Sequence, residues 1–194
     1  MSHVATEWPR RHRLTVEDYY RMGEAGILRP DERVELIDGE IIDMAPPGSL
    51  HAGTVTQLAS LLQRAAGDHA LLQVQNPVRL DRYSEPQPDL TLLRPRADFY
   101  KSAHPQPSDV LLMIEVADTS LRFDRDVKAS LYARHGIPEV WLVDVRDGRL
   151  TRYREPLQGS YSRVDQPNLS APLEVAALPD VRMDLGALFE TNTR

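Results

Sequence analysis

Two short apolar runs on either side of a helical segment constrain the fold of this chain more than any other feature of its sequence. The runs are residues 111–116 (LLMIEV) and 140–143 (VWLV). Both have the length and the β-branched content of strands that are buried on both faces. Residues 124–135 lie between them and read as a helix. Because a strand–helix–strand crossover normally joins parallel strands, the sequence predicts an α/β fold with a parallel pair here.

Glu115 stands inside the first apolar run, and this placement needs a physical explanation. An ionised carboxylate that is buried without a partner costs several kcal/mol or more. The side chain must therefore be protonated, paired with a cation or bound to a metal. Lys128 in the following helix is one candidate partner, and Asp89, which opens a predicted strand after Pro88, is another. Two acids and a lysine that converge at strand ends indicate a site for a divalent metal ion.

Composition limits the classes of protein that fit this chain. With 194 residues, 41% of them hydrophobic and 27% charged, the chain is typical of a soluble globular protein. It has no cysteine, so a metal site would use oxygen or imidazole ligands. The formal net charge of -6 argues against a surface that binds nucleic acid everywhere, but it allows a local basic cleft. No segment reads as a membrane span or a secretion signal, and we therefore expect a cytoplasmic protein without membrane contact.

The remaining segments predict helices that flank a mixed β-sheet. Asp38-Gly39, which lies between two apolar-containing runs, is a strong hairpin signal and predicts an N-terminal β-hairpin within residues 34–44. The other expected elements are helices at residues 15–22, 49–66, 97–101 and 185–189, and strands at residues 71–74, 78–80, 89–93, 150–153 and 161–164. We expect residues 1–13 to form a flexible N-terminus and residues 14–190 to form a single domain.

The predicted site suits phosphate chemistry. Mg²⁺ prefers one or two carboxylates together with water and substrate oxygens, and Asp89 and Glu115 can supply the carboxylates. The backbone carbonyl of Val116 is a third candidate ligand. Lys128 follows Asp124 by one helical turn and flanks the residues that pack inward, so its amine can reach back over the strand ends. There it would hold a water molecule or stabilise charge that develops on phosphorus.

Each of these residues also has a simpler structural interpretation. Taken alone, Asp89 marks a strand entry, Glu115 pairs with an arginine and Lys128 lies on a helix surface, but their combination favours a site. Glu35 is either an exposed hairpin residue or a member of the same cleft. Other residues have mainly structural interpretations: a helix cap or surface position for His51, and core positions for Tyr132 and Trp141.

The order of these residues resembles the PD-(D/E)XK nuclease superfamily. The matching series is Pro88-Asp89, then Glu115-Val116-Ala117, then Lys128. Ala117 occupies the position where the superfamily carries its lysine, and Lys128 fits the branches in which that lysine has moved to the next helix. A larger part of the chain, about residues 15–189, is similar to the Uma family of bacterial restriction-endonuclease-like proteins. The further matching segments are Glu35-Leu36-Ile37-Asp38-Gly39-Glu40, Asp124-x-x-x-Lys128-x-x-x-Tyr132, Gly136-Ile137 and Glu139-x-Trp141-Leu142-Val143-Asp144.

This resemblance implies a restriction-endonuclease-like fold, a homodimer, and hydrolysis of DNA phosphodiester bonds that depends on Mg²⁺, with Mn²⁺ as an alternative cation. Asp89 and Glu115 would hold the metal, Lys128 would position or activate the attacking water, and Glu35 would assist. A second hypothesis is a catalytically silent protein that keeps the fold as a nucleic-acid or protein interaction module. The net charge and the displaced lysine favour it. A third is a hydrolase of another substrate, although a lysine beside two acids suits phosphate better than sugar.

Overall fold

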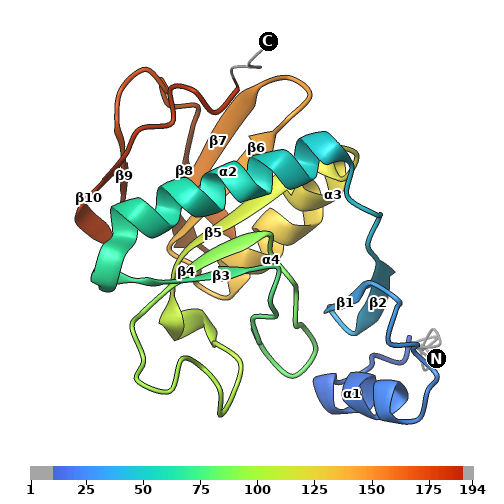
Figure 1. Ribbon diagram of the computed structural model, residues 1–194. Helices are drawn as coiled ribbons and strands as arrows, with labels where there is room; N and C mark the ends of the chain where they lie inside the picture. The colour runs from blue at the N-terminus through green and yellow to red at the C-terminus, as the bar shows by residue number, and fades with distance from the viewer. Residues whose placement is uncertain (1–10, 190–194) are drawn as a thin grey trace, which may run out of the picture.

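The computed structural model describes residues 11–189 and arranges them around a mixed β-sheet (Figure 1). The expected flexible N-terminus, residues 1–13, lies largely outside the described residues. The sheet has six strands in the order β3-β4-β5-β6-β7-β8. In this sheet β5 and β6 run parallel, and every other neighbouring pair is antiparallel. The strands are β3 (Leu71–Val74), β4 (Leu90–Leu93), β5 (Val110–Ala117), β6 (Glu139–Asp144), β7 (Arg149–Leu157) and β8 (Ser160–Asp165).

The predicted strand–helix–strand unit is confirmed and forms the centre of this sheet. β5 and β6 are buried along their whole lengths. The connection between them is helical in three consecutive parts, which are α3 (Leu121–Phe123), the π-helical turn η3 (Asp124–Lys128) and α4 (Ala129–Arg134). Asp124 and Lys128, at the two ends of η3, are both buried. Because π-helical turns inside helices occur frequently at functional sites, this turn draws attention to the residues that it carries.

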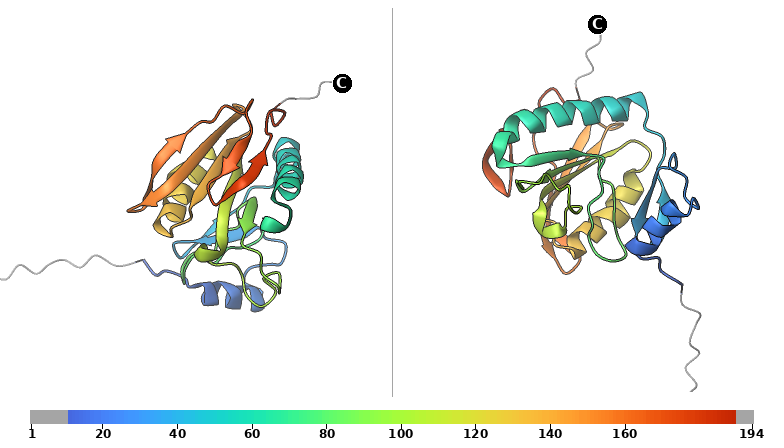
Figure 2. Two further views of the ribbon diagram at one scale, coloured as in Figure 1. Left: turned by 90° about the vertical axis from the view of Figure 1, so that its left-hand side faces the viewer. Right: turned by 60° about the horizontal axis from the view of Figure 1, so that its bottom comes forward.

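Hydrophobic cores lie on both faces of the sheet. Figure 2 shows the helices that cover these two faces. α2 (Ser49–Ala66) packs on one face through residues such as Leu58, and α4 packs on the other through residues such as Tyr132. Successive side chains of a strand point to opposite faces. Val116 of β5 therefore joins the core under α2, whereas Glu115 points toward α4. Among the helices of residues 11–189, none has the length and apolarity that a membrane crossing requires.

The predicted N-terminal hairpin is also confirmed. It consists of β1 (Val34–Ile37) and β2 (Glu40–Asp43), which pair antiparallel. Asp38 and Gly39 join them with φ angles of 51° and 82°, as expected for the two-residue turn that Asp-Gly favours. The hairpin follows α1 (Val16–Glu24), and both lie beside the main sheet (Figure 1). β1 is buried along its whole length, so the hairpin is part of the packed structure and not a projecting arm.

Three expected elements are wrong. Residues 78–80 form no strand, because the N–H groups of Val78 and Leu80 donate to the loop carbonyls of Pro86 and Ser84. Residues 97–100 and 186–189 form turns where helices were expected. Segments of about five residues are too short to form a stable helix without strong tertiary support.

A two-stranded hairpin outside the six-stranded sheet was not predicted from the sequence. It pairs β9 (Leu173–Val175) with β10 (Leu178–Met183), and its buried side chains join the core on the α2 face of the sheet. The apolar positions alternate in Leu173 and Val175 and again in Val181 and Met183, as in strands with one buried face. These runs are too short to be recognised without their tertiary partners.

Gly39 allows a test of the hairpin turn. Its φ of 82° disfavours any residue with a Cβ atom, and a Cβ built at this position would lie 2.6 Å from Cβ of Arg13. We expect Gly39→Ala to lower the free energy of unfolding by about 1–3 kcal/mol, measured by urea denaturation.

The matched control is Gly23→Ala in α1, where an added Cβ would meet no atom within 4 Å. Because alanine is the better helix former, this change should raise the free energy of unfolding by about 0.5–1 kcal/mol. Equal effects of the two substitutions would contradict the strained turn.

Candidate active site

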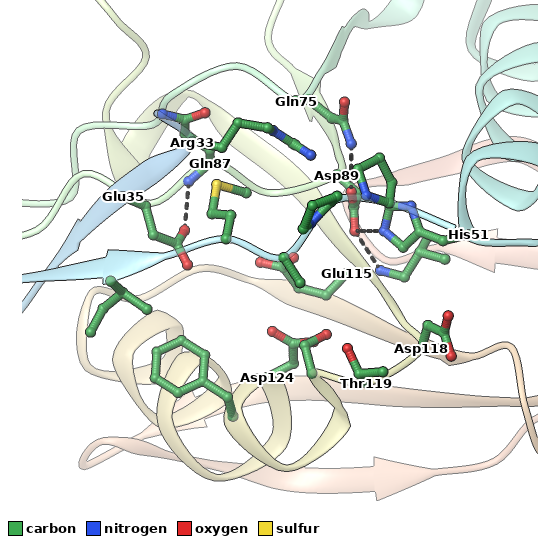
Figure 3. A pocket seen from close by; sticks show the side chains of 18 of the residues that line it. Arg33, Glu35, His51, Gln75, Gln87, Asp89, Glu115, Asp118, Thr119 and Asp124 are labelled. Carbon is green, nitrogen blue, oxygen red and sulfur yellow. Dashed lines mark hydrogen bonds and ion pairs between the residues drawn. The ribbon is translucent and has the colours of Figure 1, made fainter. Parts of the chain in front are cut away.

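The residues singled out from the sequence line one pocket of about 550 Å³ (Figure 3). Glu35 comes from β1, Asp89 directly precedes β4, and Glu115 and Val116 lie near the end of β5. Lys128 is the last residue of η3. The fold thus brings together residues from four separate segments of the chain, including Glu35, for which the sequence left open whether it belongs to the cleft.

A buried ammonium lies at the centre of this arrangement. Nζ of Lys128 is 3.0 Å from Oε1 of Glu35, 3.3 Å from Oε1 of Glu115 and 4.0 Å from Oδ1 of Asp124. The Lys128 side chain is only 4% exposed. Burial alone would lower the pKa of Lys128, but the neighbouring charges of Glu115, Glu35 and Asp124 outweigh it and raise the pKa. Lys128 is therefore a permanent cation at neutral pH, which supports a role in holding charge or water and not in accepting a proton.

Glu115 is held by two donors on one oxygen. The hydroxyl group of Tyr132 donates to Oε1 of Glu115 at 2.5 Å, and Nζ of Lys128 donates to the same oxygen. No hydrogen bond among residues 11–189 involves Oε2, which leaves that oxygen available on the pocket side. Burial raises the pKa of Glu115 well above its ordinary value; Lys128 opposes the rise, and the nearby carboxylates add to it. Without a further cation, this site therefore tends to retain a proton.

Asp89 is fixed by three donors. Its Oδ2 accepts from the N–H of Val116 at 2.9 Å and lies 3.2 Å from Nε2 of His51, and its Oδ1 accepts from Nε2 of Gln75 at 3.1 Å. Burial would raise the pKa of Asp89, but the hydrogen bonds and the charge of His51 lower it overall. Asp89 is therefore ionised at neutral pH. The contact with Val116 also links the start of β4 to the end of β5.

Glu35 connects the N-terminal hairpin to the site. Its Oε1 accepts from Lys128, and its Oε2 accepts from the backbone N–H of Gln87 at 3.0 Å. Glu35 is 2% exposed, so the interpretation as an exposed hairpin residue does not hold. Its carboxylate ties β1 to the segment that leads into Asp89.

The donor set fits a divalent cation. Four buried carboxylates, those of Glu35, Asp89, Glu115 and Asp124, line the same pocket as the buried ammonium of Lys128, and all but Asp89 lie within 4.0 Å of it. Within residues 11–189, no three histidine or carboxylate side chains yet converge as a complete ligand set. Carboxyl groups nevertheless outnumber basic groups in the lining of the pocket, and hard cations prefer oxygen ligands of this kind together with water.

Three residues at the site were not identified as functional from the sequence. His51 was interpreted as a cap or surface residue, but its ring is largely buried and contacts Asp89. Tyr132 is a core residue, as expected, and it is also the hydrogen-bond donor to Glu115. The four-residue spacing from Lys128 to Tyr132 places both on one helix face and could have indicated this role. Gln75 has no signal in the sequence, because its contact with Asp89 depends on the pairing of β3 with β4.

Comparisons with known proteins agree with the fold. The model of a family named Uma2, described as "Putative restriction endonuclease", matches residues 16–186. A solved structure described as a "putative nuclease belonging to DUF820 from Anabaena variabilis ATCC 29413" is similar, with a TM-score of 0.69. The two chains share 15% sequence identity over 91% of this chain and 97% of the other, so this likeness concerns the fold alone. Among curated proteins no match was found. These findings confirm the predicted restriction-endonuclease-like fold and the resemblance from which it was inferred.

The raised pKa of Glu115 predicts an unusual pH dependence of stability. The folded protein retains a proton that the unfolded chain releases above about pH 4.5, the ordinary pKa of a glutamate. At low pH this group therefore does not reduce the free energy of unfolding. As the pH rises above the ordinary pKa of a glutamate, the free energy of unfolding falls. We expect Glu115→Gln to remove this loss, so that without metal the variant is more stable than the wild type at pH 8.

Urea denaturation in chelator at pH 4 and pH 8 measures this difference. The matched control is Glu40→Gln on the exposed side of the hairpin, which removes the same charge from a residue outside the pocket. If Glu115→Gln were less stable than the wild type at pH 8, the excess negative charge inferred for the pocket would be wrong.

Proposed function

The chain belongs to the Uma2 family, because the family model covers residues 16–186 of its 194 residues, and we propose that it is an endonuclease that hydrolyses DNA phosphodiester bonds with Mg²⁺. Mn²⁺ is the alternative cation. The observation that carries this proposal is the buried pocket in which Asp89 and Glu115 lie beside the fixed cation of Lys128. Carboxylates that bind a metal and a lysine that stabilises developing charge are the parts that phosphodiester hydrolysis requires.

In this proposal Asp89 and Glu115 hold the metal. Oε2 of Glu115 is the oxygen left free by Lys128 and Tyr132, and Asp89 is ionised and fixed in direction by its three donors. The backbone carbonyl of Val116 is the third proposed ligand. A divalent cation, when bound, supplies positive charge to the phosphate oxygens and makes a water molecule more acidic.

Lys128 orients the reacting groups. Because it remains protonated, it can donate to a phosphate oxygen or to the attacking water but cannot remove a proton from that water. Glu35 and Asp124 keep the ammonium in place, so their proposed role is to position Lys128. The water oxygen would form its bond to phosphorus while the bond from phosphorus to the sugar oxygen opposite it breaks, and the water would lose a proton to solvent while the sugar oxygen gains one.

A catalytically silent interaction module is the second candidate. The observation in its favour is that Lys128 already has three carboxylate neighbours, which can satisfy its charge in the absence of any substrate. The formal net charge of -6 points the same way. We further propose that residues 14–190 form a single domain of a cytoplasmic protein, as expected from the sequence, and that the protein is a homodimer, as the family resemblance implies.

Cleavage of supercoiled plasmid and of a labelled single strand tests the proposed function. With Mg²⁺ or Mn²⁺ the wild type should cut, and chelator should stop it. We expect Asp89→Ala, Glu115→Ala and Lys128→Ala each to lower the rate by at least about 100-fold, because each removes a group that acts on the developing charge. Asp180→Ala, an exposed acidic position on β10, is the control for loss of one charge.

Calorimetric titration with Mn²⁺ separates the two candidates if nothing is cut. Metal binding by the wild type that Asp89→Ala abolishes would keep the metal site and show that the substrate was wrong. Absence of both cutting and metal binding would favour the silent interaction module.

A further inference from the structure

We propose that the pocket takes one unpaired nucleotide of a DNA strand, with Arg33 as its phosphate contact and an apolar wall formed by Met44 and Phe123 against its base. This inference rests on the proposed function and names the substrate class of the same site. It concerns parts of the pocket that the metal and lysine chemistry does not use.

The groups that would act on the phosphate are recessed. Asp89 is 8% exposed, Glu115 and Lys128 are each 4% exposed, and Glu35 is 2% exposed. They lie in a pocket of about 550 Å³, which is a size typical of a site for one small molecule or one nucleotide. A scissile phosphate must therefore enter the pocket to meet them. A paired duplex carries its phosphates on the outside but keeps its bases stacked inside, so it could not place a whole nucleotide in the pocket without first unpairing it.

Arg33 is the basic residue of the pocket that can contact the phosphate of a substrate. It lines the pocket from the position directly before β1 and is exposed. In Figure 3 its side chain extends from the hairpin over the pocket. Lys128 is paired with carboxylates and His51 with Asp89, whereas no ion pair or side-chain hydrogen bond within residues 11–189 involves Arg33. A guanidinium group matches the geometry of a phosphate and binds it through two parallel hydrogen bonds.

The pocket also has an apolar wall, against which the base of a nucleotide could pack. Its apolar residues come from β2, from the loop before α2 and from α3, and they are Ile42, Met44, Ala45, Pro46, Pro47 and Phe123. Single-stranded nucleic acids bind to proteins through positive charge along the backbone and through bases that stack on aromatic or apolar side chains. In a duplex the base faces are covered by their neighbours, so this wall would have nothing to contact. An unpaired nucleotide presents a phosphate and a base face together.

The experiment compares three labelled substrates that share one strand: the strand alone, the strand in a blunt duplex, and the strand as a tail on a duplex. With Mg²⁺ we expect the wild type to cut the free strand and the tail, and to cut the paired region at least about tenfold more slowly. Arg33→Gln should raise KM for the free strand about tenfold with little change in kcat, because it removes a charged contact to bound substrate.

The matched control is Arg64→Gln, which removes the same charge near the end of α2, away from the pocket. Thermal unfolding of both variants checks that each is folded. Equal cutting of duplex and single strand, or equal effects of Arg33→Gln and Arg64→Gln, would overturn the inference.

Failure of the proposed function is distinguishable from failure of this inference. If no substrate is cut, fluorescence anisotropy with the same labelled oligonucleotides and Mg²⁺ measures the affinity for the single strand and for the duplex. Tighter binding of the single strand than of the duplex, lost in Arg33→Gln and kept in Arg64→Gln, would uphold the nucleotide pocket in a protein without nuclease activity. Equal binding of the two, or no binding of either, would overturn it.

Discussion

The candidate site depends on one buried ammonium shared by carboxylates from distant parts of the chain. Glu35 comes from the N-terminal hairpin, Glu115 from the central strand and Asp124 from the helical turn that also carries Lys128. Removing the ammonium would leave its buried carboxylates without a counter-charge, which typically costs about 3–5 kcal/mol. The same ammonium therefore holds β1 against the sheet and sets the direction of Glu115. Structure and proposed chemistry rest on the same contacts.

The charge balance of the pocket has a thermodynamic cost. Burial raises the pKa of Glu115 and of Asp124, which means that the folded protein without metal resists full ionisation of its own site. Side chains that were selected only for stability would not accumulate in this way. Sites that are poised for function commonly reduce stability, and a bound cation would relieve the repulsion here. This is a physical argument for a ligand-binding role that does not depend on the family resemblance.

The parts of the fold and site that could be predicted from the sequence depend on local signals. β5, β6 and the hairpin at Asp38-Gly39 each have a pattern within a few residues, and Glu115 was conspicuous because it interrupts an apolar run. The contacts of His51 and Gln75 with Asp89 join positions 38 and 14 residues apart, and nothing local indicates them. The β9–β10 hairpin was missed for the same reason, since its short runs are defined by packing on the α2 face.

The π-helical turn between α3 and α4 separates a residue of the pocket wall from the residues that contact Glu115. A π turn contains one residue more than an α-helix needs over the same length, and one residue corresponds to a rotation of about 100° around the helix axis. Lys128 and Tyr132 lie at and beyond the end of the turn and are anchored by Glu115, whereas Phe123 lies before it and lines the pocket. A deletion or insertion of a single residue at this joint would turn the pocket wall to a new direction and leave the lysine in place. A change of length at this joint would therefore alter what enters the pocket and leave in place the groups that would carry out the reaction.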